Sequence, residues 1–251
     1  MNFHVYIPAR YASTRLPGKP LLDIDGQPLI AHVLARAQAS GAQSIVVATD
    51  DERIASAVRA CGAQACMTAA DLPSGSDRIA AAARALGVPD DQVIVNLQGD
   101  EPAMPAAVIR QVAALAHDPV CDIATVCAPL AASQLFDPNV VKVTRDDRCR
   151  ALYFSRAPIP WSRDEFANGG RGSVHLGHYR RHVGIYGYRV GFLVRFVATP
   201  PALLERLEAL EQLRALAFGA CVMVPDACAH CGTGVDTPAD LAQVRAAMAA
   251  R

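Results

Sequence analysis

Short apolar runs alternate with amphipathic stretches along the first half of this chain. Residues 3–7, 44–49 and 93–97 are apolar over nearly their whole length, which is typical of buried β-strands. Between them, hydrophobic positions recur every three or four residues, as on the buried face of a helix. The alternation predicts an α/β fold with a mostly parallel sheet that helices cover on both faces.

Capping and turn residues indicate where the helices of this half begin and end. We expect one helix to begin at Pro28 and to end at Gly41, and the next to end at Gly62. Ser74 is a suitable N-cap for a third helix. Asp50 follows the strand at 44–49, and we interpret it as the N-cap of the second helix.

The pattern loosens after about residue 120. We expect strands at 122–128, 140–144, 151–154, 183–190 and 221–224, and helices at 191–198, 203–218 and 237–248. Leu203, Leu207, Leu210 and Leu213 would form the buried side of the helix at 203–218. The polar stretch at 162–179 predicts an exposed loop. We therefore expect a single domain over residues 1–251 with a small antiparallel arm at about 150–190.

Composition restricts the possible partners and the compartment. The 24 basic residues balance 24 acidic residues, so the net charge gives no reason to expect a nucleic-acid partner. No apolar stretch approaches the roughly 18 residues that span a bilayer, and we expect no membrane partner. The apolar start is too short for a signal peptide. With eight scattered cysteines, which we expect to be reduced and buried, this predicts a cytoplasmic protein.

The stretch after the first strand contains the first candidate chemistry. Arg10, Arg15 and Lys19 fall within ten residues, with no acidic residue between them. Prolines and glycines around these cations favour a shaped loop, and such a loop at the end of a strand suits a polyphosphate. The alternative is a solvated basic loop. The stretch is not a nucleotide-binding P-loop, because Pro20 follows Lys19 where that motif requires Ser or Thr.

Two aspartates are candidates for a divalent metal that accompanies the polyphosphate. Asp100 follows the apolar run at 93–97 by three residues, and Asp236 lies between the last expected strand and the last helix. Carboxylates at strand ends are suitable Mg²⁺ ligands. Asp50 competes for this role, although the capping interpretation is favoured there.

Several segments together resemble the 3-deoxy-manno-octulosonate cytidylyltransferases, or CMP-Kdo synthetases. The resemblance extends from residue 3 to about residue 245 and lies in the segments 8–20, 74–78, 96–102, 153–156, 181–188, 210–214 and 234–237. It implies the nucleotide-diphospho-sugar transferase type of fold and a homodimer formed through the arm. It also implies transfer of a cytidylyl group from CTP to the anomeric hydroxyl of Kdo, which activates Kdo for lipopolysaccharide synthesis.

The same resemblance implies roles for individual residues. Catalysis would involve Lys19, Arg10, Arg15 and Asp100, and Mg²⁺ would bind Asp100 and Asp236. The nucleotide would contact Ala9, Arg10, Arg15, Lys19, Ser74, Arg78 and Gln98. The sugar acid would contact Gln98, Arg156, His182, Tyr186, Glu211 and Gln212.

Chemistry agrees with these sugar-site roles but leaves alternatives open. An arginine such as Arg156 can hold the Kdo carboxylate with two parallel hydrogen bonds. His182 and Tyr186 are four residues apart in an expected strand, so they would face the same side. His182 could instead be a core histidine, and Glu211 a solvated residue beside an apolar stripe. For the whole chain, the alternatives are a cytidylyltransferase for another sugar acid, such as a sialic acid, or a nucleotide-binding module without turnover.

Overall fold

A computed structural model of the chain describes residues 1–12, 16–167 and 174–249. Within these residues the strands form one mixed sheet in the order β11-β7-β10-β6-β1-β4-β5, with β8 and β9 attached to β10. Its strands are β1 (His4–Ala9), β4 (Ser44–Thr49), β5 (Gln64–Met67), β6 (Val93–Asn96), β7 (Ile123–Pro129), β8 (Lys142–Arg145), β9 (Ala151–Ser155), β10 (Arg180–Arg189) and β11 (Val222–Met223). Separately, β2 (Asp23–Ile24) and β3 (Gln27–Pro28) form a small antiparallel hairpin.

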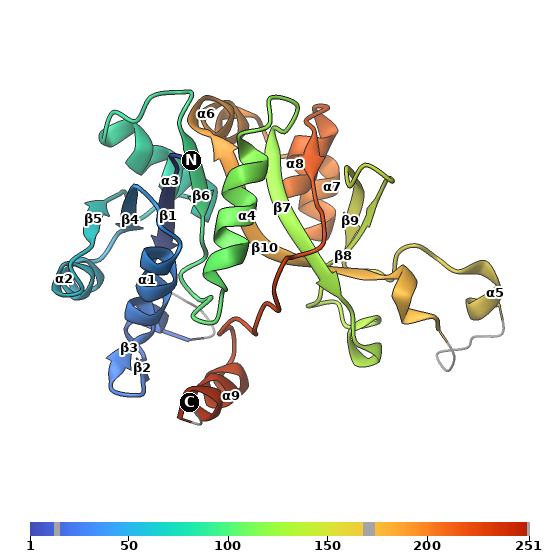
Figure 1. The fold of residues 1–251 in the computed structure, drawn as a ribbon, viewed down its shortest axis with the longest axis horizontal. Coiled ribbons are helices and arrows are strands. Elements are labelled where there is room, and N and C mark those ends of the chain that lie inside the picture. The colour runs from blue at the N-terminus through green and yellow to red at the C-terminus, as the bar shows by residue number, and fades with distance from the viewer. Residues whose placement is uncertain (13–15, 168–173, 250–251) are drawn as a thin grey trace.

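The α-helices cover both faces of this sheet, except for one in the projecting arm and the C-terminal one, which lies beside the β2–β3 hairpin (Figure 1). They are α1 (Leu29–Ala39), α2 (Glu52–Ala60), α3 (Gly75–Ala85), α4 (Ala106–Ala116), α5 (Arg163–Phe166), α6 (Val190–Ala198), α7 (Leu203–Glu208), α8 (Gln212–Ala217) and α9 (Pro238–Ala249). Short 3₁₀ turns are η1 (Lys19–Leu21), η2 (Ala132–Gln134) and η3 (Leu176–His178).

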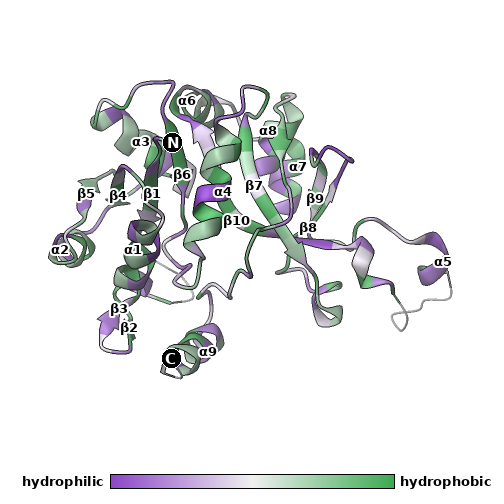
Figure 2. Cartoon of the chain, viewed as in Figure 1, coloured by the Kyte–Doolittle hydropathy of each residue, from purple (hydrophilic) through white to green (hydrophobic). Residues whose placement is uncertain are grey.

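Alternating side chains of the central strands divide the core into two layers. In β1, Val5 and Ile7 pack with α1, α2 and α4, whereas Tyr6 packs with α3 and α6 on the opposite face. In β6, Val95 and Ile94 divide in the same way. This is the period of two that a strand imposes, here with both faces buried. Figure 2 shows the hydrophobic positions along β7 and α4 and the hydrophilic ones in α5.

Parallel pairing brings the carboxyl ends of several strands to one edge of the sheet. β1 lies between β4 and β6 and is parallel to both, and β4 is parallel to β5. β10 enters antiparallel between β6 and β7 and also pairs with β8 of the β8–β9 hairpin. The α/β prediction is therefore confirmed, and the antiparallel part of the sheet is β8, β9 and β10. Residues after β1, β4 and β6 meet at the same edge, which is where open α/β sheets bind ligands.

The prediction of one continuous helix over 203–218 is wrong. The structure contains α7 and α8 instead, and Ala209 between them adopts a left-handed conformation with φ of 50°. Leu203 and Leu207 are exposed, whereas Leu210 and Leu213 are buried. Because the chain leaves the helical conformation at Ala209, the four leucines do not share one buried stripe.

Other expectations also need correction. Helix α4 was absent from the sequence-based prediction, and the stretch expected as a loop at 162–179 contains α5 and η3. The N-cap of α2 is Asp51, whose carboxylate accepts the backbone N–H of Arg53, so the capping interpretation of Asp50 is wrong. Ser74 caps α3 as expected, since its hydroxyl accepts the backbone N–H of Asp77.

The expectation that the cysteines are reduced and buried is confirmed only in part. All eight are free thiols, but Cys228 is exposed, and Cys61, Cys149 and Cys221 are only partly buried. Burial raises the pKa of the Cys121 and Cys127 thiols to about 12. These two thiols therefore remain protonated at neutral pH and behave as apolar core groups. Among the described helices, none combines the length and the apolar character that a membrane crossing requires.

Candidate functional site

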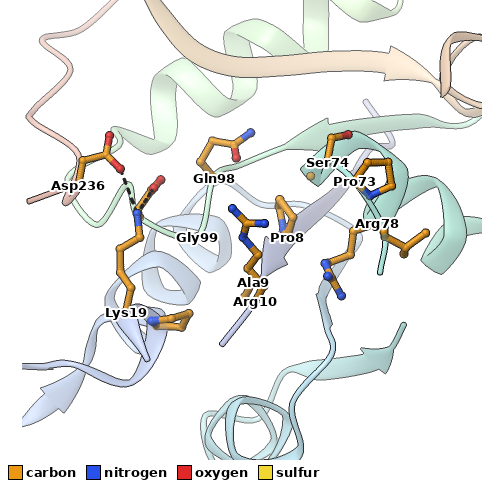
Figure 3. Close-up of a pocket in the computed structure, with 14 residues that line it drawn as sticks. Pro8, Ala9, Arg10, Lys19, Pro73, Ser74, Arg78, Gln98, Gly99 and Asp236 are labelled. Atoms are coloured by element: carbon orange, nitrogen blue, oxygen red, sulfur yellow. Dashed lines mark hydrogen bonds and ion pairs between the residues drawn. The ribbon is translucent and has the colours of Figure 1, made fainter. Parts of the chain in front are cut away.

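A cavity of about 340 Å³ opens at the carboxyl edge of the parallel strands. Segments that are far apart in sequence line it, with Lys19 and Asp236 on one side, Ser74 and Arg78 on the other, and Arg10 and Gln98 between them (Figure 3). Further lining residues are Pro8, Ala9, Pro20, Leu72, Pro73, Gly75, Gly99 and Asp100. The volume lies in the range of small-molecule sites.

Close backbone packing shapes the floor of this cavity. A Cβ atom at Gly99 would lie 2.8 Å from the carbonyl oxygen of Pro8. Gly18 has a φ of 67°, and its N–H donates to the carbonyl of Tyr11 over 3.1 Å. Glycine tolerates this left-handed conformation at no steric cost. Gly18 also immediately precedes η1, which begins with Lys19, so this turn sets where the Lys19 side chain starts.

Lys19 lies between two carboxylates. Its Nζ donates to Asp100 Oδ2 over 2.6 Å and to Asp236 Oδ1 over 3.1 Å. These carboxylates outweigh burial and raise the pKa of Lys19, so the ammonium stays charged. The sequence shows no acidic residue within the opening stretch, but the fold supplies two from distant segments. No group of three or more His, Cys, Asp or Glu residues suited to a metal ion occurs in the part of the chain that the structure describes.

A further carboxyl group lies beside these two. Burial, reinforced by Asp100, raises the pKa of Glu101 to about 8, so Glu101 is largely protonated at neutral pH. The sequence analysis did not assign a role to Glu101. Its neighbour Asp100 was the stronger candidate because it lies closer to the strand end, and burial of a side chain is not visible in the motif. Acidic groups therefore crowd the side of the cavity that contains Asp236.

The opposite wall is the N-terminal turn of α3. Its backbone N–H groups and helix dipole favour a negatively charged ligand. Arg78 follows in the same helix, is 3% exposed, and donates to Asp50 Oδ2 over 3.3 Å and to Thr68 Oγ1 over 2.6 Å. Asp50 therefore balances the charge of Arg78. Arg10, by contrast, is exposed and forms no ion pair with any residue in the described ranges.

Two of the predicted sugar-site residues lie side by side on β10. The ring centroids of His182 and Tyr186 are 5.4 Å apart, which confirms that they share a face. Burial and then Arg181 lower the pKa of His182 to about 3, so the ring is neutral. Thr125 donates its hydroxyl to the carbonyl of Val183 and lies 2.9 Å from His182 Nε2. Nε2 therefore carries the ring proton and donates to Thr125, which leaves Nδ1 as a hydrogen-bond acceptor.

Glu211 and Gln212 connect this face of β10 with the cavity. Tyr186 donates its hydroxyl to Gln212 Oε1 over 3.4 Å, and Glu211 accepts the hydroxyls of Ser74 and Ser76 over 2.8 Å each. Ser74 is itself a cavity residue. Glu211 is thus partly buried and hydrogen-bonded within the chain, so the alternative of a solvated side chain is wrong.

Arg156 lies beside the turn between α7 and α8. Its Nε donates to the carbonyl of Glu208 over 2.6 Å, Nη2 to the carbonyl of Ala209 over 3.3 Å, and Nη1 to that of Pro138 over 2.8 Å. Three of its five N–H groups are thereby used within the chain, and two remain for a ligand. Arg156 does not line the cavity itself.

The structure brings most of the predicted nucleotide and metal residues together. Ala9, Arg10, Lys19, Ser74, Arg78, Gln98, Asp100 and Asp236 all line the cavity, whereas Arg15 lies outside the described residues. Thr68 was not predicted as part of the site, and Asp50 was considered only as a competing metal ligand; both contact Arg78 without lining the cavity. The position of Asp50 directly after a strand parallel to β1 was the available signal, because parallel strand ends converge.

Comparisons with known proteins agree with this arrangement. A family model described as cytidylyltransferase matches residues 5–221. The solved structure of CMP:2-keto-3-deoxy-manno-octonic acid synthetase complexed with CTP is 42% identical, with a TM-score of 0.88 over 100% of this chain and 99% of that chain. A cytidylyltransferase from Leptospira borgpetersenii serovar Hardjo-bovis (strain JB197) is 16% identical, with a TM-score of 0.63 over 100% of this chain and 88% of that chain, and shares the fold.

Proposed function

Since this chain belongs to the cytidylyltransferase family and, within it, to the CMP-Kdo synthetases, we propose that it transfers the cytidylyl group of CTP to Kdo. The products are CMP-Kdo and pyrophosphate. CMP-Kdo is the activated sugar for lipopolysaccharide synthesis. The observation that carries this proposal is one cavity in which Arg10, Lys19 and the start of α3 lie together with the carboxylates of Asp100 and Asp236.

The nucleotide occupies the cavity in this proposal. Arg10 and Lys19 hold the triphosphate together with the N-terminal turn of α3, because charge-assisted hydrogen bonds to phosphate are strong. Ala9, Ser74, Arg78 and Gln98 complete the nucleotide contacts. Arg15 has the same role by its position in the opening stretch, where it lies between Arg10 and Lys19 in sequence.

The residues present fit a divalent metal. Asp100 and Asp236 already share one positive charge, the Lys19 ammonium, within 3.1 Å of an oxygen of each. Mg²⁺ is commonly held by one or two carboxylates, with substrate phosphates and water as its other ligands. We assign Asp100 and Asp236 as the protein ligands. When bound, Mg²⁺ would supply positive charge to the triphosphate oxygens.

The sugar acid lies next to the nucleotide. Gln98 would be shared by both substrates, and His182, Tyr186, Glu211 and Gln212 would contact Kdo. The neutral His182 offers Nδ1 as an acceptor for a sugar hydroxyl. The two remaining N–H groups of Arg156 would hold the Kdo carboxylate. This half of the site thus combines acceptors for hydroxyl groups with a cation for the acid.

The reaction is an in-line displacement at the α-phosphorus of CTP. The anomeric oxygen of Kdo forms a bond to phosphorus as it loses its proton, and the bond between the α-phosphorus and the bridging oxygen breaks. Pyrophosphate leaves with that oxygen. Arg10 and Lys19 stabilise the charge that develops on the phosphate oxygens. No covalent intermediate on the protein is required, so positioning and electrostatics supply the catalysis.

A pyrophosphate-release assay with CTP and a panel of sugar acids tests the proposed function. We expect turnover with Kdo and much lower turnover with a sialic acid. Equal turnover with both would contradict the substrate assignment and leave a cytidylyltransferase with another specificity. Binding of CTP without turnover of any sugar acid would instead support a nucleotide-binding module.

Kinetics with each substrate varied in turn test the sugar half. The Arg156→Lys variant keeps a positive charge but loses the planar fork, and His182→Ala removes the acceptor. We expect both to raise the KM for Kdo more than the KM for CTP. A defect confined to CTP would refute these sugar-site assignments.

We further propose that the chain forms one domain and pairs as a homodimer through the arm at about 150–190. Support comes from large hydrophobic side chains that are exposed in this region, among them Leu152 and Trp161, at 62% and 64%. The free thiols of all eight cysteines agree with a cytoplasmic location.

A further inference from the structure

Asp50 connects the two walls of the nucleotide cavity without lining the cavity itself. One oxygen, Oδ1, accepts the backbone N–H of Tyr11 over 3.2 Å, and the other, Oδ2, accepts Nη2 of Arg78 over 3.3 Å. Tyr11 lies just after β1, and Arg78 belongs to α3. We propose that Asp50 is a positioning residue for CTP, which sets Tyr11 and Arg78 relative to each other. The inference rests on the proposed function, because it concerns the nucleotide that this site would bind.

Through Tyr11, Asp50 also acts on the backbone beside Lys19, which holds the phosphates in the proposed function. Tyr11 accepts the N–H of Gly18 through its carbonyl over 3.1 Å, and its ring lies against the place where a Cβ of Gly18 would be. Lys19 follows Gly18 directly and begins η1. An altered Asp50 would therefore disturb the backbone from which the Lys19 side chain extends.

The contact with Arg78 sets both the place and the charge of that guanidinium. Arg78 is 3% exposed, and its second terminal nitrogen donates to Thr68. Thr68 in turn donates its hydroxyl to the carbonyl of Thr49, the residue before Asp50. A buried arginine without a carboxylate partner is strongly unfavourable, so Asp50 keeps Arg78 in this place at the cavity wall.

The matched pair Asp50→Asn and Asp51→Asn tests the proposal. The asparagine at position 50 keeps the shape and an acceptor for the Tyr11 N–H but removes the charge that faces Arg78. Asp51 is the adjacent N-cap of α2 and contacts Arg53 at the surface. We expect Asp50→Asn to raise the Kd for CTP, measured by calorimetry at fixed Mg²⁺, by about tenfold. We expect the Asp51→Asn protein to remain within about twofold of the unaltered one.

Steady-state kinetics separate positioning from a general loss of structure. In the Asp50→Asn variant the KM for CTP should rise while the KM for Kdo stays nearly unchanged, and raised Mg²⁺ should not restore the affinity. In an Arg78→Gln background, the Asp50→Asn change should add little, since both changes remove the same ion pair. Equal rises in both KM values, fully additive effects, or recovery with Mg²⁺ would each refute the proposal.

A second variant tests the same contact if Asp50→Asn does not fold. Thr68→Val removes the hydroxyl that receives Arg78 Nη1, and we expect a smaller rise in the Kd for CTP in the same direction. An unchanged Kd would contradict the positioning of Arg78 by this network. The proposed function is tested separately. It is refuted if the unaltered protein releases no pyrophosphate from CTP and Kdo.

Discussion

At the scale of single residues, Lys19 shows how the fold balances charge in the candidate site. Its ammonium contacts Asp100 and Asp236, which lie 81 and 217 residues away along the chain. Bound triphosphate would bring more negative charge to the same place. Lys19 thus offsets the repulsion between the two carboxylates, and in the proposed function it also contacts the phosphates.

We expect Lys19→Ala to lower kcat/KM for CTP by roughly ten- to a hundredfold, because it removes a charge-assisted contact. The fold should persist, since the side chain is not part of the core. Steady-state kinetics and circular dichroism measure the two effects. Arg59→Ala, which removes an exposed cation of α2, serves as the control. Near-normal kcat/KM for Lys19→Ala would show that the cavity does not hold the triphosphate in the proposed way.

Glu211 and Asp77 both lie within hydrogen-bond distance of the Ser74 hydroxyl. The Ser74 hydroxyl is 2.8 Å from Glu211 and 2.6 Å from Asp77 Oδ2, yet a hydroxyl has only one proton to donate. The two carboxyl groups therefore compete for one donor, which disfavours a negative charge on both. Burial raises the pKa of Glu211, and Asp77 raises it further, while Ser76, Ser74 and Arg214 oppose the shift.

This arrangement predicts a pH-dependent stability. The folded state holds the Glu211 proton more tightly than the unfolded chain, whose ordinary pKa is 4.5. The stabilisation is therefore fully present below that value and is lost as the pH rises through the higher pKa of the folded state. Tyr186 and Tyr188 also face Glu211, but burial raises their pKa values and keeps them neutral in this range.

Glu211→Gln should remove this part of the pH dependence. We expect the stability of the variant, relative to the unaltered protein, to improve as the pH rises above 4.5 and through the raised pKa of Glu211 in the folded state. Urea denaturation at several pH values measures the difference. A difference that stays constant over this range would mean that Glu211 has no raised pKa in the folded state.

At the scale of elements, the break between α7 and α8 orients Glu211 and Gln212. Ala209 adopts a left-handed conformation there, and the carbonyls of Glu208 and Ala209 both accept Arg156. A left-handed conformation costs a non-glycine residue on the order of 1 kcal/mol. The contact with Arg156 helps to offset this cost.

Ala209→Gly should therefore stabilise the protein, by up to about 0.5 kcal/mol after the larger entropy of glycine in the unfolded chain is included. The same substitution inside a helix, Ala215→Gly in α8, should destabilise it by at least about 1 kcal/mol. Urea unfolding of both variants measures this opposite sign. Destabilisation by Ala209→Gly would show that the turn is not under conformational strain.

We predict that the metal binds Asp100, after the end of β6. We expect Asp100→Asn to lose activity that raised Mg²⁺ restores only in part, because the change keeps the shape but removes a charge that attracts Mg²⁺. Pyrophosphate release over a range of Mg²⁺ concentrations measures this. Asp91→Asn, an exposed position before β6, is the control. If Asp50→Asn needed more Mg²⁺ and Asp100→Asn did not, the metal would bind at the end of β4 instead of the end of β6.

At the scale of the whole molecule, the arm leaves large hydrophobic side chains in contact with solvent. In Figure 1 the segment that contains β8, β9 and α5 projects to one side of the main sheet. Trp161 is 64% exposed although it contacts Phe166 within this arm. Exposed apolar groups of this kind mark protein–protein contacts when they gather in one region.

We expect the unaltered protein to sediment as a dimer, and Trp161→Glu to shift it toward the monomer, because a charge would be buried in the interface. Sedimentation velocity at several protein concentrations measures this. Phe218→Glu changes an exposed aromatic residue outside the arm and should leave the dimer intact. A monomeric unaltered protein would refute the proposed dimer.

The sequence by itself determined most strands of the parallel part of the sheet and the basic character of the opening stretch. Strand β4 was predicted at 44–49, as observed, because hydrophobic periodicity is a local property. Ser74 was recognised as a cap for the same reason. Arg10, Arg15 and Lys19 follow from residue type together with a position after a strand, whereas the other proposed nucleotide contacts rest on the family resemblance.

Only the tertiary structure decided which of these groups meet. The acidic partners of Lys19, and the pairing of Asp50 with Arg78 in place of the helix N-cap, depend on how parallel strand ends converge. The exposure of Leu207 depends on the turn at Ala209 and on what packs against α7, which periodicity within one segment does not reveal. Contacts between residues far apart in sequence arise only when the sheet assembles, and burial, which sets the pKa values of His182 and Glu211, arises with them.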